Sequence, residues 1–170
     1  IVVAVDKPSV FKVSRNWLDK GWPVLCETPA GLKMEDLEDA WRFHCYGTRF
    51  QVAEQYHCYP RYEKIIEVVK SGVLGDPQAV DLSAAHDYHA VSLIRRILGV
   101  GFENAFFTGK RFTFPVLETA GRDGIIENGQ IKDSYRIRMD MEFDSGKMGF
   151  YDFDKVQYHS RIRGIEIRIQ

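Results

Sequence analysis

Two histidines three residues apart offer the clearest acid-base chemistry in this sequence of 170 residues. His86 and His89 share one face of a helix if that helix begins early enough to include both. An imidazole titrates near neutral pH, so His89 is a candidate general acid or base, with His86 and Tyr88 as further candidate catalytic groups. The alternative is structural, since histidines near a helix terminus also make ordinary capping hydrogen bonds. The spacing alone favours that alternative.

Other polar and aromatic side chains could complete a site around these histidines. Tyr56 and His57 directly follow an apolar segment at a predicted domain junction, and Tyr158 lies in a polar stretch, Gln157-Tyr158-His159-Ser160. These three residues are candidates for substrate binding, because substrate clefts commonly form at such junctions. Tyr56 would otherwise pack an interdomain surface. Arg161 and Arg163 are typical surface cations, although a carboxylate or phosphate on a substrate would suit them.

The first 54 residues contain the elements of a parallel sheet covered by helices. Three short apolar strands are expected at Ile1–Val5, Pro23–Cys26 and Phe50–Ala53. A helix with Val10, Val13 and Trp17 on one face lies between the first two strands, and Pro8 suits its first turn. A second helix, with Met34, Leu37, Trp41 and Cys45 at helical spacing, separates the last two. The sequence therefore predicts a β-α-β-α-β order for this part.

The second predicted domain, residues 55–170, changes from helices to alternating strands along its length. A helix carries Tyr62, Ile65, Ile66 and Val69 on one face, and a strand at 79–84 precedes a helix from Asp87 to Leu98. Period-two alternation then predicts an antiparallel sheet. Its strands are expected at Phe106–Phe114, Tyr135–Phe143, Met148–Phe153 and Arg163–Ile169. A loop is expected from Glu118 to Lys132, so the fold class is α/β followed by α+β, with a large, mostly antiparallel open sheet.

Composition excludes several classes of partner. The formal net charge is -1 with acids and bases interleaved, so the chain lacks the basic stripe that binds nucleic acid. Its apolar runs are far shorter than the roughly 20 residues that span a bilayer. The three cysteines, Cys26, Cys45 and Cys58, lack metal-site spacing, and they are expected to be reduced core thiols of a cytoplasmic protein.

The order of several short motifs resembles the glucose-fructose oxidoreductase/inositol dehydrogenase (Gfo/Idh/MocA-type) family. The resemblance covers most of the chain and rests on the strand at Val2–Val5, on Gly21 to Pro29, on Phe50 to Gln55, on Ser71 to Pro77, and on His89 with Leu93 to Gly99. The chain begins and stops within β-branched runs, so it is expected to be a fragment of such a protein. The resemblance implies a partial Rossmann-type domain at residues 1–54, which lacks the GxGxxG turn here. It implies a substrate and oligomerisation domain at residues 55–170.

The resemblance also implies a cofactor and a reaction. It implies an oxidoreductase that uses NAD or NADP, acts on a sugar, a polyol or a related hydroxy compound, and forms homo-oligomers through its C-terminal sheet. Loops at the carboxyl ends of parallel strands line the cofactor crevice of an open α/β sheet. The cofactor-binding candidates are therefore Asp6, Lys7, Pro8, Glu27, Thr28, Pro29 and Gln55. Without the resemblance, Pro8 and Pro29 would only shape turns, and Glu27 would cap a helix.

Two departures from the family pattern affect the expected chemistry. Thr28 stands where the family has the lysine of a Glu-Lys-Pro motif, and Ala85 stands where it has the aspartate of Asp-x-Gly-x-His. A neutral hydroxyl cannot replace an ammonium as a proton donor. His89 matches the family histidine and becomes the leading candidate proton carrier. Two alternatives stay open: a non-catalytic binding or oligomerisation module, and a metal-dependent hydrolase or lyase using His57, His86, His89 and His159.

Overall fold

The structure, a computed structural model, describes residues 1–47, 49–160 and 163–170. The chain divides into two compact units, Ile1–Gln55 and Tyr56–Gln170. Each unit is built around its own hydrophobic core. Among the described residues, no helix combines the length and the apolar character that crossing a bilayer requires.

The first unit is a three-stranded parallel sheet in the order β1-β2-β3 with two helices. Its elements are β1 (Val2–Val3), α1 (Val10–Leu18), β2 (Val24–Cys26), α2 (Met34–Cys45) and β3 (Phe50–Val52). The predicted order of elements is confirmed. The helix α1 begins two residues after Pro8, with Ser9 as its N-cap, so Pro8 precedes the helix and does not lie in its first turn.

Only one face of this sheet is covered by the helices. Val3, Val24 and Cys26 are buried against α1 and α2, whereas Val2 is 73% and Leu25 is 39% exposed on the opposite face. This contrast follows from the alternation of side chains along a strand. Parallel sheets normally bury both faces, so the uncovered face is unusual for this sheet type.

The helix α2 forms as predicted, but its large apolar side chains do not enter the core. Met34, Leu37 and Trp41 are exposed, and the helix instead contacts the sheet side through Ala40 and Phe43. Cys45 shares the exposed position of these residues. The prediction of core thiols is therefore wrong for Cys45 and Cys58, and right for the buried Cys26.

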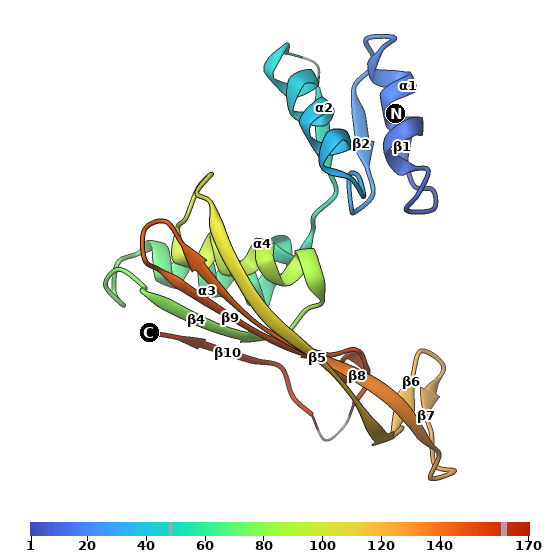
Figure 1. Cartoon of the computed structure of the whole chain (residues 1–170), viewed down its shortest axis with the longest axis vertical. Helices are drawn as coiled ribbons and strands as arrows, with labels where there is room; N and C mark the ends of the chain where they lie inside the picture. The colour runs from blue at the N-terminus through green and yellow to red at the C-terminus, as the bar shows by residue number, and fades with distance from the viewer. Residues whose placement is uncertain (48, 161–162) are drawn as a thin grey trace. The chain divides into compact units, whose positions relative to one another are not determined.

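The second unit pairs a five-stranded sheet with two helices on one face (Figure 1). Its helical elements are η1 (Tyr56–Cys58), α3 (Pro60–Lys70), α4 (Asp87–Leu98) and η2 (Lys155–Tyr158). The strands of the sheet are β4 (Ala79–Ser83), β5 (Ala105–Leu117), β8 (Ile131–Phe143), β9 (Met148–Asp154) and β10 (Glu166–Ile169).

The strand order β10-β4-β9-β8-β5 makes this sheet mostly antiparallel, as predicted. The exception is the pair β4 and β9, which run parallel with Leu82 beside Tyr151. Their carboxyl ends therefore lie next to each other at one edge of the sheet. This is where α4 begins, four residues after Ser83, and where η2 follows β9.

The core of the second unit lies between this sheet and α4. Leu93, Ile94 and Ile97 of α4 are at most 1% exposed and pack against buried strand residues such as Leu82 and Met141. Gly99 ends the helix with φ 69°, a left-handed conformation in which glycine has no Cβ strain. The helix has the predicted bounds, and its packing fixes the position of its first turn.

The segment predicted as a loop, Glu118 to Lys132, contains a small hairpin. Its strands are β6 (Ala120–Gly121) and β7 (Gly124–Ile125). Gly124 adopts φ 118°, a value that favours glycine at the turn. Strands of two residues carry too little periodicity to be recognised in a sequence.

Candidate functional site

The predicted cofactor residues follow the three parallel strands of the first unit at their carboxyl ends. Asp6, Lys7 and Pro8 come after β1 and are exposed, and Gln55, also exposed, comes shortly after β3. The Ser9 hydroxyl donates a hydrogen bond to Asp6 Oδ2 at 3.1 Å. Strand direction therefore gathers these residues at one edge of the sheet, the edge at which open α/β sheets bind ligands.

The loop after β2 is ordered by its own hydrogen bonds. The backbone N–H and the hydroxyl of Thr28 both donate to Glu27 Oε1, at 2.8 and 3.0 Å. The Thr28–Pro29 peptide bond is cis, and the next residues, Ala30 and Gly31, are buried. Glu27 remains exposed and Thr28 and Pro29 are half-buried, so this loop presents an acidic and a hydroxyl group at the same edge.

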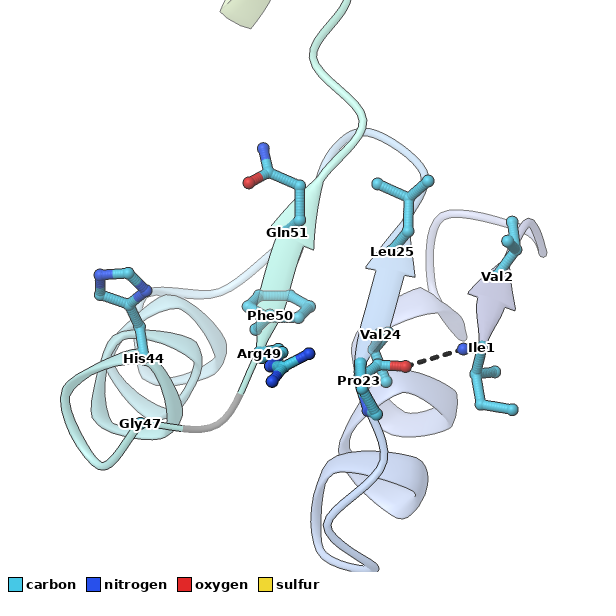
Figure 2. Close-up of a pocket in the computed structure, with 10 residues that line it drawn as sticks. All are labelled: Ile1, Val2, Pro23, Val24, Leu25, His44, Gly47, Arg49, Phe50 and Gln51. Atoms are coloured by element: carbon cyan, nitrogen blue, oxygen red, sulfur yellow. Dashed lines mark hydrogen bonds between the residues drawn. The ribbon is translucent and has the colours of Figure 1, made fainter.

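A hollow of the first unit lies elsewhere (Figure 2). It has a volume of about 580 Å³ and is lined on the uncovered sheet face by Val2, Leu25 and Gln51, with His44 and Arg49 beside them. The N-terminal ammonium donates to Pro23 O at 2.7 Å within it. None of the predicted cofactor residues lines this hollow, and its apolar floor is sheet surface that a helix would normally cover.

The histidine pair of the second unit lies at the start of α4. His86 is the N-cap residue with extended backbone angles, and Asp87 follows with φ 45°. Such a φ is uncommon for a residue other than glycine and costs on the order of 1–2 kcal/mol. The Tyr151 hydroxyl accepts the Asp87 backbone N–H at 3.1 Å. Strained backbone of this kind is frequent at functional sites.

Tyr158, in η2, makes two hydrogen bonds to this helix terminus and a third to η1. Its hydroxyl accepts the backbone N–H of His86 at 3.0 Å and lies 2.5 Å from the Nδ1 atom of the same residue. It also lies 2.9 Å from the hydroxyl of Tyr56. Burial raises the pKa of Tyr158, so the phenol stays protonated at neutral pH.

His89 lies at the centre of an aromatic cluster. It is 5% exposed, and its ring stacks on Tyr56 with centroids 4.4 Å apart. The Tyr88 ring lies 4.4 Å away and the His86 ring 4.8 Å away, edge-on. The structure therefore brings together all three catalytic candidates and two of the three substrate-binding candidates, Tyr56 and Tyr158.

The short helix η2 is fixed by a polar network that the sequence analysis did not identify. Asp154 is fully buried and accepts hydrogen bonds from Ser134 Oγ at 2.8 Å, Val156 N at 3.1 Å and Arg163 Nη1 at 2.5 Å. The side-chain amide oxygen of Gln157 in turn accepts the Asp154 backbone N–H at 3.2 Å. The spacing Asp-x-x-Gln is that of a capping box, which is the signal that could have revealed it.

Gln157 also links η2 to the end of β4. Its amide nitrogen donates to the Ser83 hydroxyl at 2.8 Å and to Gly164 O at 3.0 Å. Ser83 lies three residues before His86, and Tyr158 follows Gln157. This link therefore holds the two hydrogen-bonded partners, His86 and Tyr158, in a fixed relation.

The remaining polar candidates are spread around this cluster. His57 lies in η1, next to Tyr56, and His159 follows η2 with its ring 6.5 Å from that of Tyr158. Arg163 pairs with the buried Asp154, so its role in the structure is to compensate that charge. Arg161 lies outside the described residues. Within the described part of the chain, no group of three or more histidine, cysteine or acidic side chains is arranged to hold a metal ion.

The two departures from the family pattern lie in different surroundings. Ala85 is fully buried next to Ala84 in the core of the second unit. Thr28 is half-buried in the loop after β2 and donates to Glu27. Neither position supplies an ionisable group.

Comparisons with known proteins identify solved structures of the same fold, all of them at low sequence identity. Neither the protein-family models nor the curated proteins give a match to the sequence. Solved structures do match, with 99% of this chain covered in each case below. They include an NAD-binding oxidoreductase from Klebsiella pneumoniae (TM-score 0.72, 12% identity) and GenD2 from gentamicin A biosynthesis in complex with NAD (TM-score 0.67, 16% identity).

A third match is an inositol dehydrogenase homologue from Azotobacter vinelandii, solved with NADH and myo-inositol (TM-score 0.63, 19% identity, 99% of this chain covered). This chain covers 51%, 53% and 47% of the three matched chains. It therefore spans about half the length of the solved structures that it resembles. The fold predicted from the sequence is confirmed, and the chain has the fold of the Gfo/Idh/MocA-type oxidoreductases over that half.

Proposed function

We propose that the chain belongs to an NAD(P)-dependent oxidoreductase that acts on a CH–OH group of a sugar, a polyol or a related hydroxy compound. The supporting observation is the cluster of His86, His89, Tyr56 and Tyr158 beside the carboxyl ends of the parallel pair β4 and β9. This cluster occurs in a fold that is shared with structures solved with NAD or NADH. One of those structures also binds myo-inositol, a polyol.

The cofactor side of the proposal rests on the first unit. Asp6, Lys7 and Pro8 after β1, the segment Glu27–Pro29 after β2, and Gln55 after β3 would contact the nucleotide. They fit such a ligand because they stand at the carboxyl edge of a parallel sheet, and the exposed Asp6, Lys7, Glu27 and Gln55 offer polar groups there. The chain contains no GxGxxG turn, so these residues match the nicotinamide side of a site.

The chemistry of the second unit is proton transfer. When bound, the nicotinamide supplies the hydride chemistry, and the protein must carry the proton of the substrate hydroxyl. We assign this proton to His89, which gains it during oxidation and returns it during reduction. Tyr56 holds the His89 ring by stacking, and His86 and Tyr88 flank the same ring. Tyr56 and His57 would bind the substrate hydroxyls, whereas the Tyr158 hydroxyl is already bonded to His86 and Tyr56.

The test measures cofactor binding and turnover in the intact protein. NAD(H) and NADP(H) are titrated by calorimetry, and polyols including myo-inositol are screened by absorbance at the nicotinamide band. Turnover is expected to fall by 10²-fold or more, roughly, in His89→Asn, because general acid-base catalysis contributes about that much. The matched control is His44→Gln, an exposed histidine of the first unit. Equal turnover in His89→Asn and the control would contradict the assignment.

A non-catalytic role is the second candidate, and Thr28 and Ala85 are the observations that favour it. A binding module would bind the dinucleotide without turnover of any polyol. In that case His89→Asn and wild type would have the same dinucleotide affinity and no activity. Stoichiometric zinc or iron in the purified protein would instead support a metal-dependent hydrolase or lyase.

The large sheet of the second unit supports a homo-oligomer as part of this proposal. On its edge strand β5, Phe106 is 68% exposed and Phe107 is 49% exposed. Exposed aromatic side chains on an edge strand suit an interface. Light scattering after size-exclusion chromatography would test this, and Phe106→Asp should shift the mass toward the monomer.

A cytoplasmic location suits the three free thiols of the chain.

A further inference from the structure

Three groups in the candidate site form a continuous hydrogen-bonded chain. The Tyr158 hydroxyl stands in the middle, 2.5 Å from His86 Nδ1 and 2.9 Å from the Tyr56 hydroxyl. His86 lies 72 residues from Tyr158, and Tyr56 lies 102 residues from it. Three separate elements, η1, the start of α4 and η2, therefore meet at one phenol oxygen.

The hydrogen-bonding capacity of this oxygen restricts how the chain can be arranged. A phenol hydroxyl has one hydrogen to donate and two lone pairs that accept. One lone pair is used by the backbone N–H of His86, which donates to it at 3.0 Å. One hydrogen and one lone pair are left for His86 Nδ1 and Tyr56. Tyr158 must therefore donate to one of these two groups and accept from the other.

Two arrangements satisfy this condition. In the first, Tyr56 donates to Tyr158, which donates to an unprotonated His86 Nδ1. In the second, His86 Nδ1 carries a proton and donates to Tyr158, which donates to Tyr56. The imidazolium form has a proton on both ring nitrogens, so protonation of His86 selects the second arrangement.

We propose that Tyr158 is a positioning residue that couples the protonation of His86 to the hydroxyl of Tyr56. One proton added at the Tyr56 oxygen shifts the Tyr56 hydrogen to Tyr158 and the Tyr158 hydrogen to His86 Nδ1. The net change is one proton gained by His86, and both phenols stay neutral. This coupling rests on the proposed oxidoreductase function for its use, since it would deliver protons to the catalytic cluster.

The surroundings of Tyr158 support a fixed geometry for this relay. Asp154 caps η2 and is fully buried. Gln157 ties η2 to Ser83 at the end of β4. Removal of the relay hydroxyl leaves these two supports of η2 unchanged, although the His86 backbone N–H then loses its acceptor.

Several other titratable groups lie close enough to influence His86. They are Asp87, Tyr88 and His89 on α4, Tyr56 on η1, Tyr151 on β9, and Tyr158 on η2. His89 is the most important of them, because it is also an imidazole and its ring touches Tyr56. A test must therefore separate the titration of His86 from that of His89.

The experiment follows tyrosine and histidine side chains by NMR in the 170-residue chain. The protein carries ¹³C at tyrosine Cζ and ¹⁵N in its histidine rings, and spectra are recorded from pH 5 to 9. The pKa of His86 is read from its own ring nitrogens. In wild type, the Cζ resonances of Tyr158 and Tyr56 should both inflect at the pKa of His86. In Tyr158→Phe, Tyr56 should lose that inflection, whereas any inflection at the His89 pKa should remain.

Two further variants complete the test. Tyr46→Phe, an 85% exposed tyrosine of the first unit, is the control and should behave as wild type. In His86→Gln both tyrosines should lose the inflection, which tests the relay independently of the folding of Tyr158→Phe. A Tyr56 inflection at the His86 pKa that persists in either variant, or that is missing in wild type, would overturn the relay. The NMR result does not depend on turnover, so an intact inflection supports the relay even where the turnover test contradicts the oxidoreductase proposal.

Discussion

At the residue scale, the candidate site places two phenols beside its two histidines. The family-like pattern has a lysine and an aspartate where this chain has Thr28 and Ala85. Ala85 is fully buried in the core, where an unpaired carboxylate would be costly. The polar groups next to His86 and His89 are instead the hydroxyls of Tyr56 and Tyr158.

The thiol Cys26 should be unreactive although it is reduced. Burial raises the pKa of Cys26 to about 11, and the thiol is fully enclosed. At pH 8 only about one thousandth of such a thiol is thiolate, the form that reacts. Iodoacetamide should therefore modify the exposed Cys45 and Cys58 in the native chain and Cys26 only after denaturation. Peptide mass spectrometry would measure this, and early labelling of Cys26 would contradict the burial of β2.

Tyr151 should make the stability of the chain fall at alkaline pH. Burial raises the pKa of Tyr151 from 10.0 to about 12. Between these values the unfolded chain loses the phenol proton and the folded chain keeps it, so unfolding becomes more favourable as pH rises. The loss of folding stability begins near pH 10 and reaches about 2–3 kcal/mol near pH 12.

Tyr151→Phe is the variant that checks this effect. Urea unfolding followed by circular dichroism should show a shallower alkaline decline than wild type. At pH 7 the variant should be less stable by about 1–3 kcal/mol, since the Asp87 N–H loses its acceptor. Tyr46→Phe is the exposed control. Parallel alkaline curves for wild type and Tyr151→Phe would show that Tyr151 is not the cause.

At the element scale, periodicity predicts the long elements and misses those that depend on tertiary contacts. The helix α4 has the predicted bounds, Asp87 to Leu98, because an apolar stripe and a terminal glycine mark it locally. The exposed apolar residues of α2 show the opposite case. Helical spacing reveals a stripe, but whether another element covers it is decided by the rest of the fold.

In the candidate site, too, local sequence patterns predict some features, and tertiary contacts decide the others. The spacing of His86 and His89 places both near the start of one helix. The contact of His86 with Tyr158 joins residues 72 positions apart, and no local pattern encodes it. The parallel pairing of β4 and β9 that places η2 there is equally non-local. The sequence could therefore nominate Tyr158 as a polar group near a strand end but not pair it with His86.

The packing of α4 on β9 leaves no room for a side chain at Gly149. A Cβ at this position would lie 2.7 Å from Ile94 Cγ2 and 3.3 Å from Met141 Cε. Both neighbours are fully buried, so they cannot move into solvent. Gly149→Ala should therefore destabilise the second unit by about 1–3 kcal/mol in urea unfolding. Gly101→Ala, with open space around its Cβ, should have little effect, and equal stability of both variants would contradict this packing.

At the scale of the whole molecule, the two units differ in the size of their cores. The second unit buries a large cluster between α4 and its sheet, including Leu93, Ile94 and Met141. The first unit buries a smaller set around Val24 and Cys26, and one face of its sheet stays uncovered. Stability grows with the apolar area that a unit buries. The first unit should therefore be the less stable of the two.

Unfolding of the 170-residue chain should reveal the lower stability of the first unit. All three tryptophans, Trp17, Trp22 and Trp41, lie in the first unit, so their fluorescence reports that unit alone. Far-UV circular dichroism mainly reports the second unit, which has more helix and strand residues. The fluorescence transition should therefore occur at lower urea concentration than the dichroism transition. Val24→Ala should shift only the fluorescence curve. Leu93→Ala should shift the dichroism curve by roughly 2–5 kcal/mol, and coincident curves in all three proteins would mean that the units unfold as one.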